Sequence, residues 1–450
     1  MRIAALSAVA TAVASSSSSS LQPELHAPAT SSLTLLTEPH ELHLSRMYVS
    51  EGNSTDCGVD SMQRHANGTE TMAPLHHEFR EPPPMPASID ALIRDSAAEL
   101  DEDGPMMIAH ISSKPAFTYI PHARATFKEH LVGTFGVLAA WGQPVDVRRC
   151  GLVHTAYSGD LFQFYVYDAG NETDRGVVRS VVGEEAERLT WLFGTVQRGA
   201  LLGLADVMSG ALERAGEMGA DPEAATRVRH RLGGEINVTN SEIAKMIIVT
   251  LADYLEQMVE VNGWRDHHQV DAPLRLYPGD GRPAIAMHWI SRMCLAVRDH
   301  LDAIPPIFGR CTRTISHADE VGARDAYWKV VTDEDTLLEA EQLALLAEAA
   351  RRNPFVGEPL LLLAQLHFRN GRHALAAEAC AAALERFYDM ATAWDKRRSY
   401  ANWVGFARML YLRATRMARG LPSLPFNEAL PRTSGGLQLT SIEDIAAEMP

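Results

Sequence analysis

Apolar residues recur at helical spacing through most of this chain from residue 89 onwards. Ile89, Leu92, Ile93 and Ala97 fall on one face of a helix, because three or four residues make about one helical turn. The residues before this point show neither helical nor strand periodicity. Order is therefore expected to begin near residue 89 and to be helical.

Two helix starts carry the same capping signal, a threonine followed three residues later by a glutamate. The threonine hydroxyl can accept a hydrogen bond from the first turn, and the glutamate carboxylate can reach back to the threonine N–H. The pairs are Thr126 with Glu129 and Thr239 with Glu242. We predict a long helix after each threonine.

Further helices are expected between these two. One should follow Pro144, since proline is tolerated at the start of a helix. Another should span residues 177–193 with an interruption near Gly183. Residues 162–167 are aromatic and β-branched enough for a short strand, although their length favours a loop or a minor hairpin. The pattern as a whole predicts an all-α fold.

The last third of the chain resembles tetratricopeptide repeats. Counting 34 residues, the period of that repeat, from Pro354 gives Tyr388, and Trp394 then falls early in the first helix of the next unit. A half-repeat covers residues 337–352. The other matching positions are Leu360, Leu363, Ala364, His367, Gly371, Ala376, Cys380, Ala383 and Leu384. Such arrays usually need about three units to stand alone, so we expect this shorter array to pack against the domain before it.

Composition and periodicity divide the chain into five parts. Residues 1–86, rich in Ser, Thr, Pro and His, are expected to form a disordered leader and linker, and residues 87–310 a helical domain. A connection over 311–335 leads to repeats over 336–420 and a tail over 421–450. The start of the chain has one Arg, many Ala and Ser, and no acid, which suits a plastid transit peptide or an untargeted cytoplasmic leader better than a secretory signal.

The charge balance limits the partners. The 450 residues carry a formal net charge of -16, which repels phosphate backbones, and no basic stripe overturns that sign. The hydrophobic share of 46% and the charged share of 22% are typical of globular domains, and no apolar run approaches a membrane span. The five cysteines never form a CxxC pair, which indicates neither a zinc ribbon nor a disulfide scaffold. Nucleic acid and membranes are not expected as partners.

Three ionisable residues lie on otherwise apolar helical faces of the first domain, namely His130, His154 and Asp253. A carboxylate after the apolar run that precedes Asp253 is costly unless it is paired or bound to a metal. Two imidazoles and one carboxylate would suit a divalent Mn, Fe or Zn ion, which can acidify a water and orient a phosphate ester. Taken singly, each residue has a plainer explanation as a core histidine or a salt-bridged aspartate.

The order and context of these three residues resemble the HD-domain metal-dependent phosphohydrolases, in particular the hydrolase domain of RelA/SpoT-type alarmone enzymes. The likeness is closer still to an uncharacterised HD-like domain of unknown function found in algae and plants. It is carried by Glu129-His130-Leu131, Gly133-Thr134, Trp141-Gly142, Gly151-Leu152-Val153-His154, Gly183-Glu184-Glu185-Ala186-Glu187 and Leu251-Ala252-Asp253-Tyr254-Leu255-Glu256. The resemblance implies that His130, His154 and Asp253 are metal ligands.

Several positions depart from that pattern. Thr155 stands where the family has a metal-binding aspartate directly after the second histidine, and Asp160 is the carboxylate nearest to the usual position of the catalytic acid. Asp160, Glu184 or Glu185 would have to supply the lost charge. Gln257 lies in the stretch where the family contacts its nucleotide, so these contacts should differ.

An anionic substrate would meet Arg124 and Arg175, since guanidinium groups bind phosphate in a bidentate manner, although surface ion pairs are the plainer explanation. Thr155 and Gln257 complete the predicted substrate contacts. His267 and His268, with Asp271 and then His288, could form a second metal site, but adjacent histidines before a proline-rich turn are usually exposed loop residues.

Two functions of different classes fit this sequence. The first is an HD-like protein that binds a divalent metal and hydrolyses a phosphorylated small molecule or nucleotide, with the repeats contacting a protein partner or a second copy. The second is a catalytically silent scaffold that acts through its repeats. The motifs GxSxG, GxxxxGK[ST], GxGxxG after a strand and HExxH are absent from the sequence, so no other chemistry competes.

Overall fold

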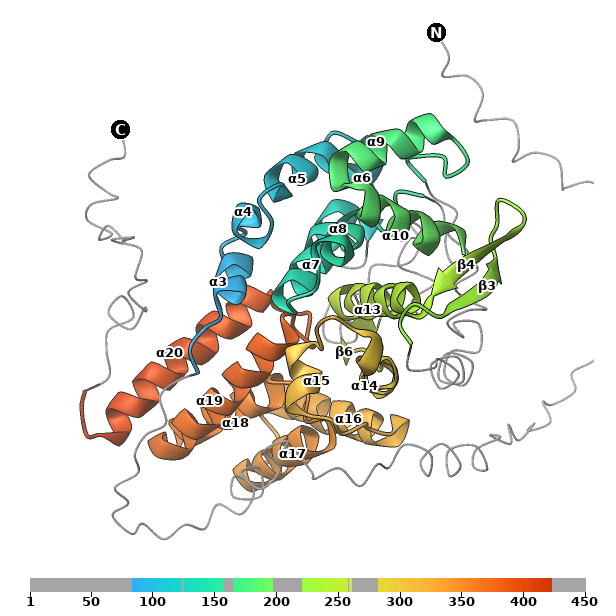
Figure 1. Ribbon diagram of the computed structural model, residues 1–450. Coiled ribbons are helices and arrows are strands. Elements are labelled where there is room, and N and C mark those ends of the chain that lie inside the picture. The colour runs from blue at the N-terminus through green and yellow to red at the C-terminus, as the bar shows by residue number, and fades with distance from the viewer. Residues whose placement is uncertain are drawn as a thin grey trace, which may run out of the picture. The chain divides into compact units, whose positions relative to one another are not determined.

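The computed structural model describes residues 83–122, 125–157, 165–196, 221–257, 259–260 and 282–422 (Figure 1). Helices make up most of this part of the chain, which confirms the predicted all-α class in its coarse form. None of the described helices has both the length and the apolar character of a membrane span.

Two groups of helices follow one another along the chain. The first comprises α3 (Ala87–Ile93), α4 (Ala97–Leu100), α5 (Gly104–Ser112), α6 (Pro115–Tyr119), α7 (Phe127–Ala140), α8 (Val145–Val153), α9 (Glu172–Val182), α10 (Glu184–Thr195) and α13 (Asn240–Gln257). The second comprises α14 (Met287–Ala296), the 3-10 helix η2 (Arg298–His300), α15 (Pro306–Arg310), α16 (His317–Asp333), α17 (Glu339–Arg352), α18 (Glu358–Arg369), α19 (His373–Met390) and α20 (Tyr400–Ala418). Three antiparallel strand pairs accompany them: β1 (Pro121–His122) with β2 (Ala125–Thr126), β3 (Ala225–Arg229) with β4 (Glu235–Thr239), and β5 (Val259–Glu260) with β6 (Arg282–Pro283).

Both predicted capping boxes form. Ahead of α7, the Thr126 hydroxyl accepts the Glu129 N–H at 3.3 Å, and the Glu129 carboxylate accepts the Thr126 N–H at 2.8 Å. Ahead of α13, Thr239 and Glu242 make the same two hydrogen bonds at 3.1 and 3.0 Å. These bonds satisfy N–H groups that a helix start leaves open, so they fix where both helices begin.

The predicted break near Gly183 is also confirmed. Helix α9 ends at Val182 and α10 begins at Glu184, with Gly183 between them at a φ of 91°. A side chain is strained at such a φ, so glycine is the residue that fits. Pro144 directly precedes α8, as predicted.

Helix α13 is buried on nearly every side. It packs against α7, α8 and α10 (Figure 1), and α7 in turn packs against α8. From Ile243 to Ala252 every residue except Lys245 is buried. A surface helix would bury only a stripe, so α13 is a core helix. Its packing on α7 places its last turn beside the first turn of α7.

The β3–β4 hairpin is an element that the apolar periodicity did not predict. Its strands pair in the register that sets Ala225 opposite Thr239, and most of their side chains are exposed or half-buried. Strands that bury so little carry a weak alternation of apolar and polar residues. Of the stretch 162–167, which had the composition of a short strand, residues 165–167 form no strand and the others lie outside the described residues.

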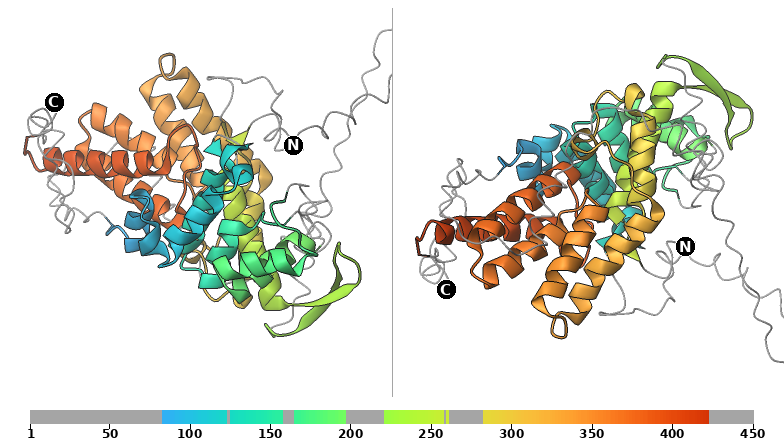
Figure 2. Two further views of the ribbon diagram at one scale, coloured as in Figure 1. Left: turned by 90° about the horizontal axis from the view of Figure 1, so that it is seen from above. Right: turned by 90° about the horizontal axis from the view of Figure 1, so that it is seen from below.

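The helices of the second group pack in the order of the chain, with α16 on α17, α17 on α18, α18 on α19 and α19 on α20 (Figure 2). Helix α17 ends at Arg352, directly before Asn353 and Pro354, as predicted. Gly371 turns the chain between α18 and α19 at a φ of 72°. Small residues at the predicted repeat positions of α19 are buried: Ala376, Cys380 and Ala383.

Trp394 does not lie in a helix, so the prediction that placed it early in a further repeat is wrong. Helix α19 has already ended, Ala391 turns the chain at a φ of 60°, and α20 begins only at Tyr400. The backbone N–H groups of Trp394 and Asp395 donate to the buried carboxylate of Glu358, at 2.7 and 3.1 Å. A side chain that is distant in sequence supplies the acceptor, and local periodicity cannot reveal it.

The cysteines differ in state. Cys294 and Cys380 are buried free thiols, and burial raises the pKa of both well above the ordinary value. Neither has the lowered pKa of a reactive nucleophile. Cys311 takes part in a disulfide, which the scattered cysteine spacing did not predict.

Glu358 is at the centre of a buried polar network. Besides the two backbone N–H groups, the network contains Asp395, which accepts from the hydroxyl of Tyr327 at 2.6 Å and from Arg397 at 2.9 Å. Burial raises the pKa of Glu358, the backbone donors oppose this rise, and the nearby charge of Asp395 adds to it. The pKa of Glu358 is therefore raised to about 7.

We predict that this group makes the protein less stable as the pH rises from about 4.5 to about 7. In that window the folded state keeps a proton on Glu358 that the unfolded state has lost, so raising the pH favours unfolding. Glu358→Gln keeps an acceptor oxygen but cannot ionise. Its free energy of unfolding should exceed that of wild type by an amount that grows to about 3 kcal/mol at pH 8. Urea unfolding at pH 5 and pH 8 measures this, and an unchanged difference between the two proteins would contradict it.

Candidate metal centre

Three side chains of metal-binding type converge beside the last turn of α13. His130 comes from the first turn of α7, His154 from the end of α8, and Asp253 from α13 itself. Each offers a ligand atom, and these atoms all lie within 4.8 Å of one another. The structure thus brings together the three residues that the sequence marks as a ligand set.

His130 is contacted through both of its ring nitrogens. Its Nδ1 lies 2.5 Å from Oε2 of Glu256, and its Nε2 lies 3.1 Å from Oδ1 of Asp253. The His130 side chain is only 3% exposed. Asp253 and Glu256 are three residues apart in α13, so their carboxylates project from the same face of that helix. One helix turn therefore holds both nitrogens of one buried imidazole.

His154 is oriented by its own helix. It follows the last residue of α8, and its Nδ1 lies 2.7 Å from the carbonyl oxygen of Gly151. A carbonyl oxygen only accepts, so Nδ1 must carry the proton of that hydrogen bond. The Nε2 atom faces Oδ1 of Asp253 at 3.8 Å, and the ring packs edge-on against Phe193.

Asp253 is held in turn by an outer layer of polar groups. Gln257, one helical turn later, donates from Nε2 to Oδ1 of Asp253 at 2.7 Å. The amide oxygen of Gln257 accepts from Nε2 of His122, which is buried. The His122 ring also lies 4.5 Å from the ring of His130, centroid to centroid. The Asp253 oxygen that faces both imidazoles is therefore fixed by Gln257.

The two carboxylates change the protonation of His130. Burial lowers the pKa of its imidazole, but the hydrogen bonds and negative charges of Asp253 and Glu256 outweigh this effect and raise the pKa to about 9. Without an ion, His130 is therefore an imidazolium at neutral pH and donates to both carboxylates. An ion at Nε2 would replace the proton there.

The donor set fits a divalent transition metal. The Nδ1 atoms of His130 and His154 contact acceptors outside the ligand set. Their Nε2 atoms both face the same oxygen of Asp253. Ligands that bind an ion at about 2.0 to 2.2 Å lie roughly 3 to 4.4 Å from each other. The two nitrogen–oxygen distances of 3.1 and 3.8 Å fall within that interval. Imidazoles with one carboxylate suit Zn, Mn and Fe.

The remaining predicted site residues are not among the three that converge. Thr155 is buried, and its hydroxyl has no hydrogen-bond partner among the described residues. Arg175 forms a bidentate ion pair with buried Glu187, at 2.8 and 3.0 Å, so its guanidinium is engaged within the protein. Glu184 is exposed in the first turn of α10 and is not one of the three converging residues. Two further predicted residues lie outside the described part of the chain, Asp160 and Arg124.

The second group of potential ligands is represented among the described residues by His288. This residue is buried in α14. Its Nδ1 lies 2.6 Å from buried Glu320, which also accepts the backbone N–H groups at the start of α14. The His288 ring is therefore held by the glutamate that caps the start of α14. The remaining members lie outside the described residues: His267, His268 and Asp271.

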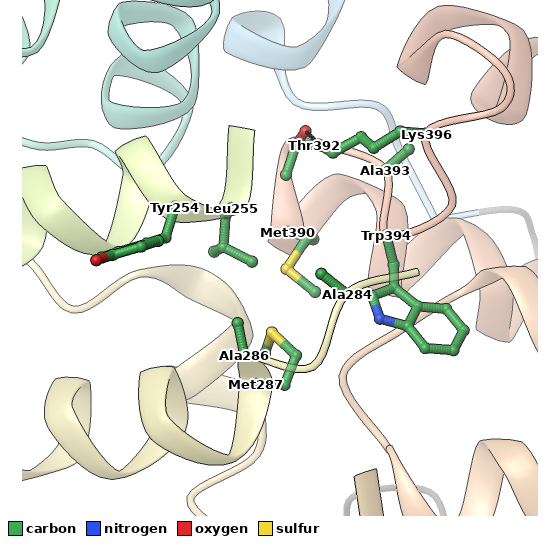
Figure 3. Close-up of a pocket in the computed structure, with 10 residues that line it drawn as sticks. All are labelled: Tyr254, Leu255, Ala284, Ala286, Met287, Met390, Thr392, Ala393, Trp394 and Lys396. Atoms are coloured by element: carbon green, nitrogen blue, oxygen red, sulfur yellow. Dashed lines mark hydrogen bonds between the residues drawn. The ribbon is translucent and has the colours of Figure 1, made fainter. Parts of the chain in front are cut away.

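An apolar pocket lies against a different side of α13. Tyr254 and Leu255, which follow Asp253 in sequence, line it together with Met287 of α14 and Met390 of α19 (Figure 3). None of the three converging residues is among its lining. The candidate metal centre is therefore separate from this pocket.

Glu256 and His122 are parts of the site that were not predicted from the sequence. For Glu256 a signal was available, because a spacing of three from Asp253 places both carboxylates on one helix face. His122 gave no such signal, since its contact with Gln257 depends on the pairing of β1 with β2 ahead of α7.

Comparison with known proteins gives one match. Residues 113–198 are similar to a protein family described as a domain of unknown function, DUF6817. This stretch contains His130 and His154 but not Asp253. No curated protein and no solved structure matches the chain. The expected domain of unknown function is therefore confirmed for this part of the chain, and the match carries no activity.

Gly133 leaves the space that Glu256 occupies. A Cβ atom at Gly133 would lie 2.7 Å from Cγ and 2.8 Å from Oε1 of Glu256. Such distances are far below van der Waals contact. Gly176 in α9 is a matched helical glycine, because a Cβ atom there would meet nothing within 4 Å.

We predict opposite effects for alanine at these two glycines. Gly176→Ala should raise the free energy of unfolding by about 0.5 to 1 kcal/mol, because alanine favours the helix. Gly133→Ala should lower it by about 1 to 3 kcal/mol, because the new methyl group collides with the Glu256 side chain. Urea unfolding measures both. A similar gain in the two variants would show that Glu256 does not occupy this space.

Proposed function

We propose that the protein binds one divalent transition metal through His130, His154 and Asp253 and acts on a phosphorylated small molecule. The proposal assigns residues 87–310 to an HD-like domain and residues 336–420 to tetratricopeptide-like repeats. The observation that carries it is the arrangement of two buried imidazoles whose Nε2 atoms face one carboxylate oxygen while both Nδ1 atoms contact other acceptors. Metal-binding histidines are usually held through their second nitrogen in this way.

A bound divalent ion would supply a Lewis acid that acidifies water and polarises a phosphate ester. The chain itself holds the ligands in place. Gln257 fixes the Asp253 oxygen toward both rings, and Gly151 fixes the tautomer of His154. Thr155 offers a buried hydroxyl where the HD pattern has a carboxylate, so the ion meets less negative charge. We therefore expect hydrolysis to be weak.

The second candidate is a catalytically silent scaffold that contacts a protein partner or a second copy through its repeats. It is favoured by the state of the site without an ion, in which the His130 imidazolium is already hydrogen-bonded to Asp253 and Glu256. Such a network is satisfied without an ion, so convergence alone does not require one. Metal content separates the two candidates.

We predict that the purified full-length protein binds close to one equivalent of Zn²⁺, Mn²⁺ or Fe²⁺ after metal-free protein is incubated with the ion and desalted. Metal content is measured by elemental analysis, and phosphate release is measured on a panel of nucleotides and sugar phosphates. His154→Ala and the isosteric Asp253→Asn should lose most of the bound metal, because each removes one of three ligands, and any hydrolysis should be lost with it.

His317→Ala is the matched control, since this histidine is exposed at the start of α16. It should retain the metal. Circular dichroism shows whether each variant is folded. A folded wild-type protein that binds no metal would contradict the metal proposal and favour the scaffold. Full metal binding by folded Asp253→Asn would place the ion elsewhere.

A further inference from the structure

Glu256 is the closest polar neighbour of His130 outside the three converging residues. Its Oε2 lies 2.5 Å from Nδ1 of His130, and its side chain is 15% exposed. The two nitrogens of an imidazole point away from opposite sides of the ring. Because Asp253 faces the Nε2 atom, Glu256 lies behind the ring and not at the point where the three ligand atoms converge.

The opposite oxygen of Glu256 is directed at helix α7. A Cβ atom on Gly133 would lie within 2.8 Å of Oε1 and 2.9 Å of Cδ of this carboxylate. Gly133 comes one helical turn after His130. The carboxylate is thus held between the His130 ring and the bare backbone of Gly133, and this packing keeps it against Nδ1.

The charge balance of the site also favours a role for Glu256. Asp253 and Glu256 together carry two negative charges, which equal the charge of a divalent ion. In a buried site of low effective dielectric constant, an unbalanced ion is strongly disfavoured. Among the described residues, Glu256 adds a second carboxylate beside Asp253 at a site whose position 155 is a threonine.

We propose that Glu256 is a positioning residue, which holds the proton of neutral His130 on Nδ1 and presents the Nε2 lone pair to the ion. The part of this inference that concerns the ion rests on the proposed function. A carboxylate behind a ligating imidazole fixes its tautomer and makes it a stronger ligand, and its removal typically weakens metal binding by about 10- to 100-fold.

The direct test is the tautomer of His130 in the metal-free protein. The spectra are recorded at a pH high enough to leave the ring neutral. Long-range ¹H–¹⁵N correlation spectra of histidine-labelled protein report which nitrogen carries the proton, and His130→Gln assigns the signal. Wild type should show the proton on Nδ1. Glu256→Ala should move it largely to Nε2, which free imidazoles of histidine favour. An unchanged tautomer would overturn the proposal.

The second test separates orientation from charge. Glu256→Gln keeps an acceptor oxygen and should keep the Nδ1–H tautomer, but it loses the negative charge. Competition of Zn²⁺ with a chromogenic chelator should then give affinities in the order wild type, Glu256→Gln, Glu256→Ala, with the last about 10- to 100-fold weaker than wild type and all at one equivalent. Equal affinities of wild type and Glu256→Ala would overturn the part that concerns the ion.

The two arms of the test, the His130 tautomer and the Zn²⁺ affinity, also distinguish this inference from the proposed function. If wild type binds no metal yet shows the Nδ1–H tautomer, and Glu256→Ala loses it, Glu256 positions His130 and the metal proposal fails. If wild type binds one equivalent and Glu256→Ala changes neither tautomer nor affinity, the metal proposal stands and the role of Glu256 is refuted. Glu378→Ala, at an exposed position of α19, is the matched control for handling and should equal wild type in both arms.

Discussion

The interaction on which the site depends is the contact between one buried imidazole and two carboxylates from a single turn of α13. His130 is 3% exposed, with Asp253 on one nitrogen and Glu256 on the other. Charged groups in such an environment are costly unless they pair with each other or hold an ion. Two states would therefore satisfy these groups: an imidazolium between two carboxylates or, if the proposed metal binds, a neutral imidazole that shares the ion with Asp253 and His154. The raised pKa of His130, about 9, is the mark of the first state and the reason why an ion must displace a proton.

The fold delivers these groups through helix starts and ends. The capping box at Thr126 begins α7, so that His130 falls in its first turn, and the box at Thr239 begins α13. Asp253 lies about 20 Å further along α13 at 1.5 Å per residue, directly after the stretch from Ile243 to Ala252 whose burial keeps the helix in place. His154 follows the last turn of α8, where a carbonyl oxygen that the helix leaves open accepts its Nδ1 proton. The second group of helices contains a different buried acid, Glu358, whose side-chain oxygen accepts backbone N–H groups between α19 and α20.

The parts that could be predicted from the sequence are those with local causes. Capping pairs, the break at Gly183 and the end of α17 before Pro354 follow from residues that are close in the chain. The three converging residues stood out because each ionisable side chain interrupts an apolar helical face, but their grouping as one ligand set came from the resemblance to the HD-domain pattern. The position of Trp394 was missed, because a carboxylate from α18 replaces the hydrogen bonds of a helix there. The ion pair of partly exposed Arg175 with buried Glu187 and the outer contact of His122 with Gln257 depend on pairings across the fold, which periodicity does not encode.

X-ray absorption at the zinc edge of the zinc-loaded full-length protein tests the central claim most directly, since it counts imidazoles around the ion. We expect two imidazole ligands per zinc at about 2.0 to 2.1 Å, with the remaining positions filled by oxygen. In His154→Ala the fitted number of imidazoles should fall to one. A zinc ion surrounded by oxygen or sulfur alone, or a wild-type imidazole count that His154→Ala leaves unchanged, would contradict the assignment of His130, His154 and Asp253 as a metal centre.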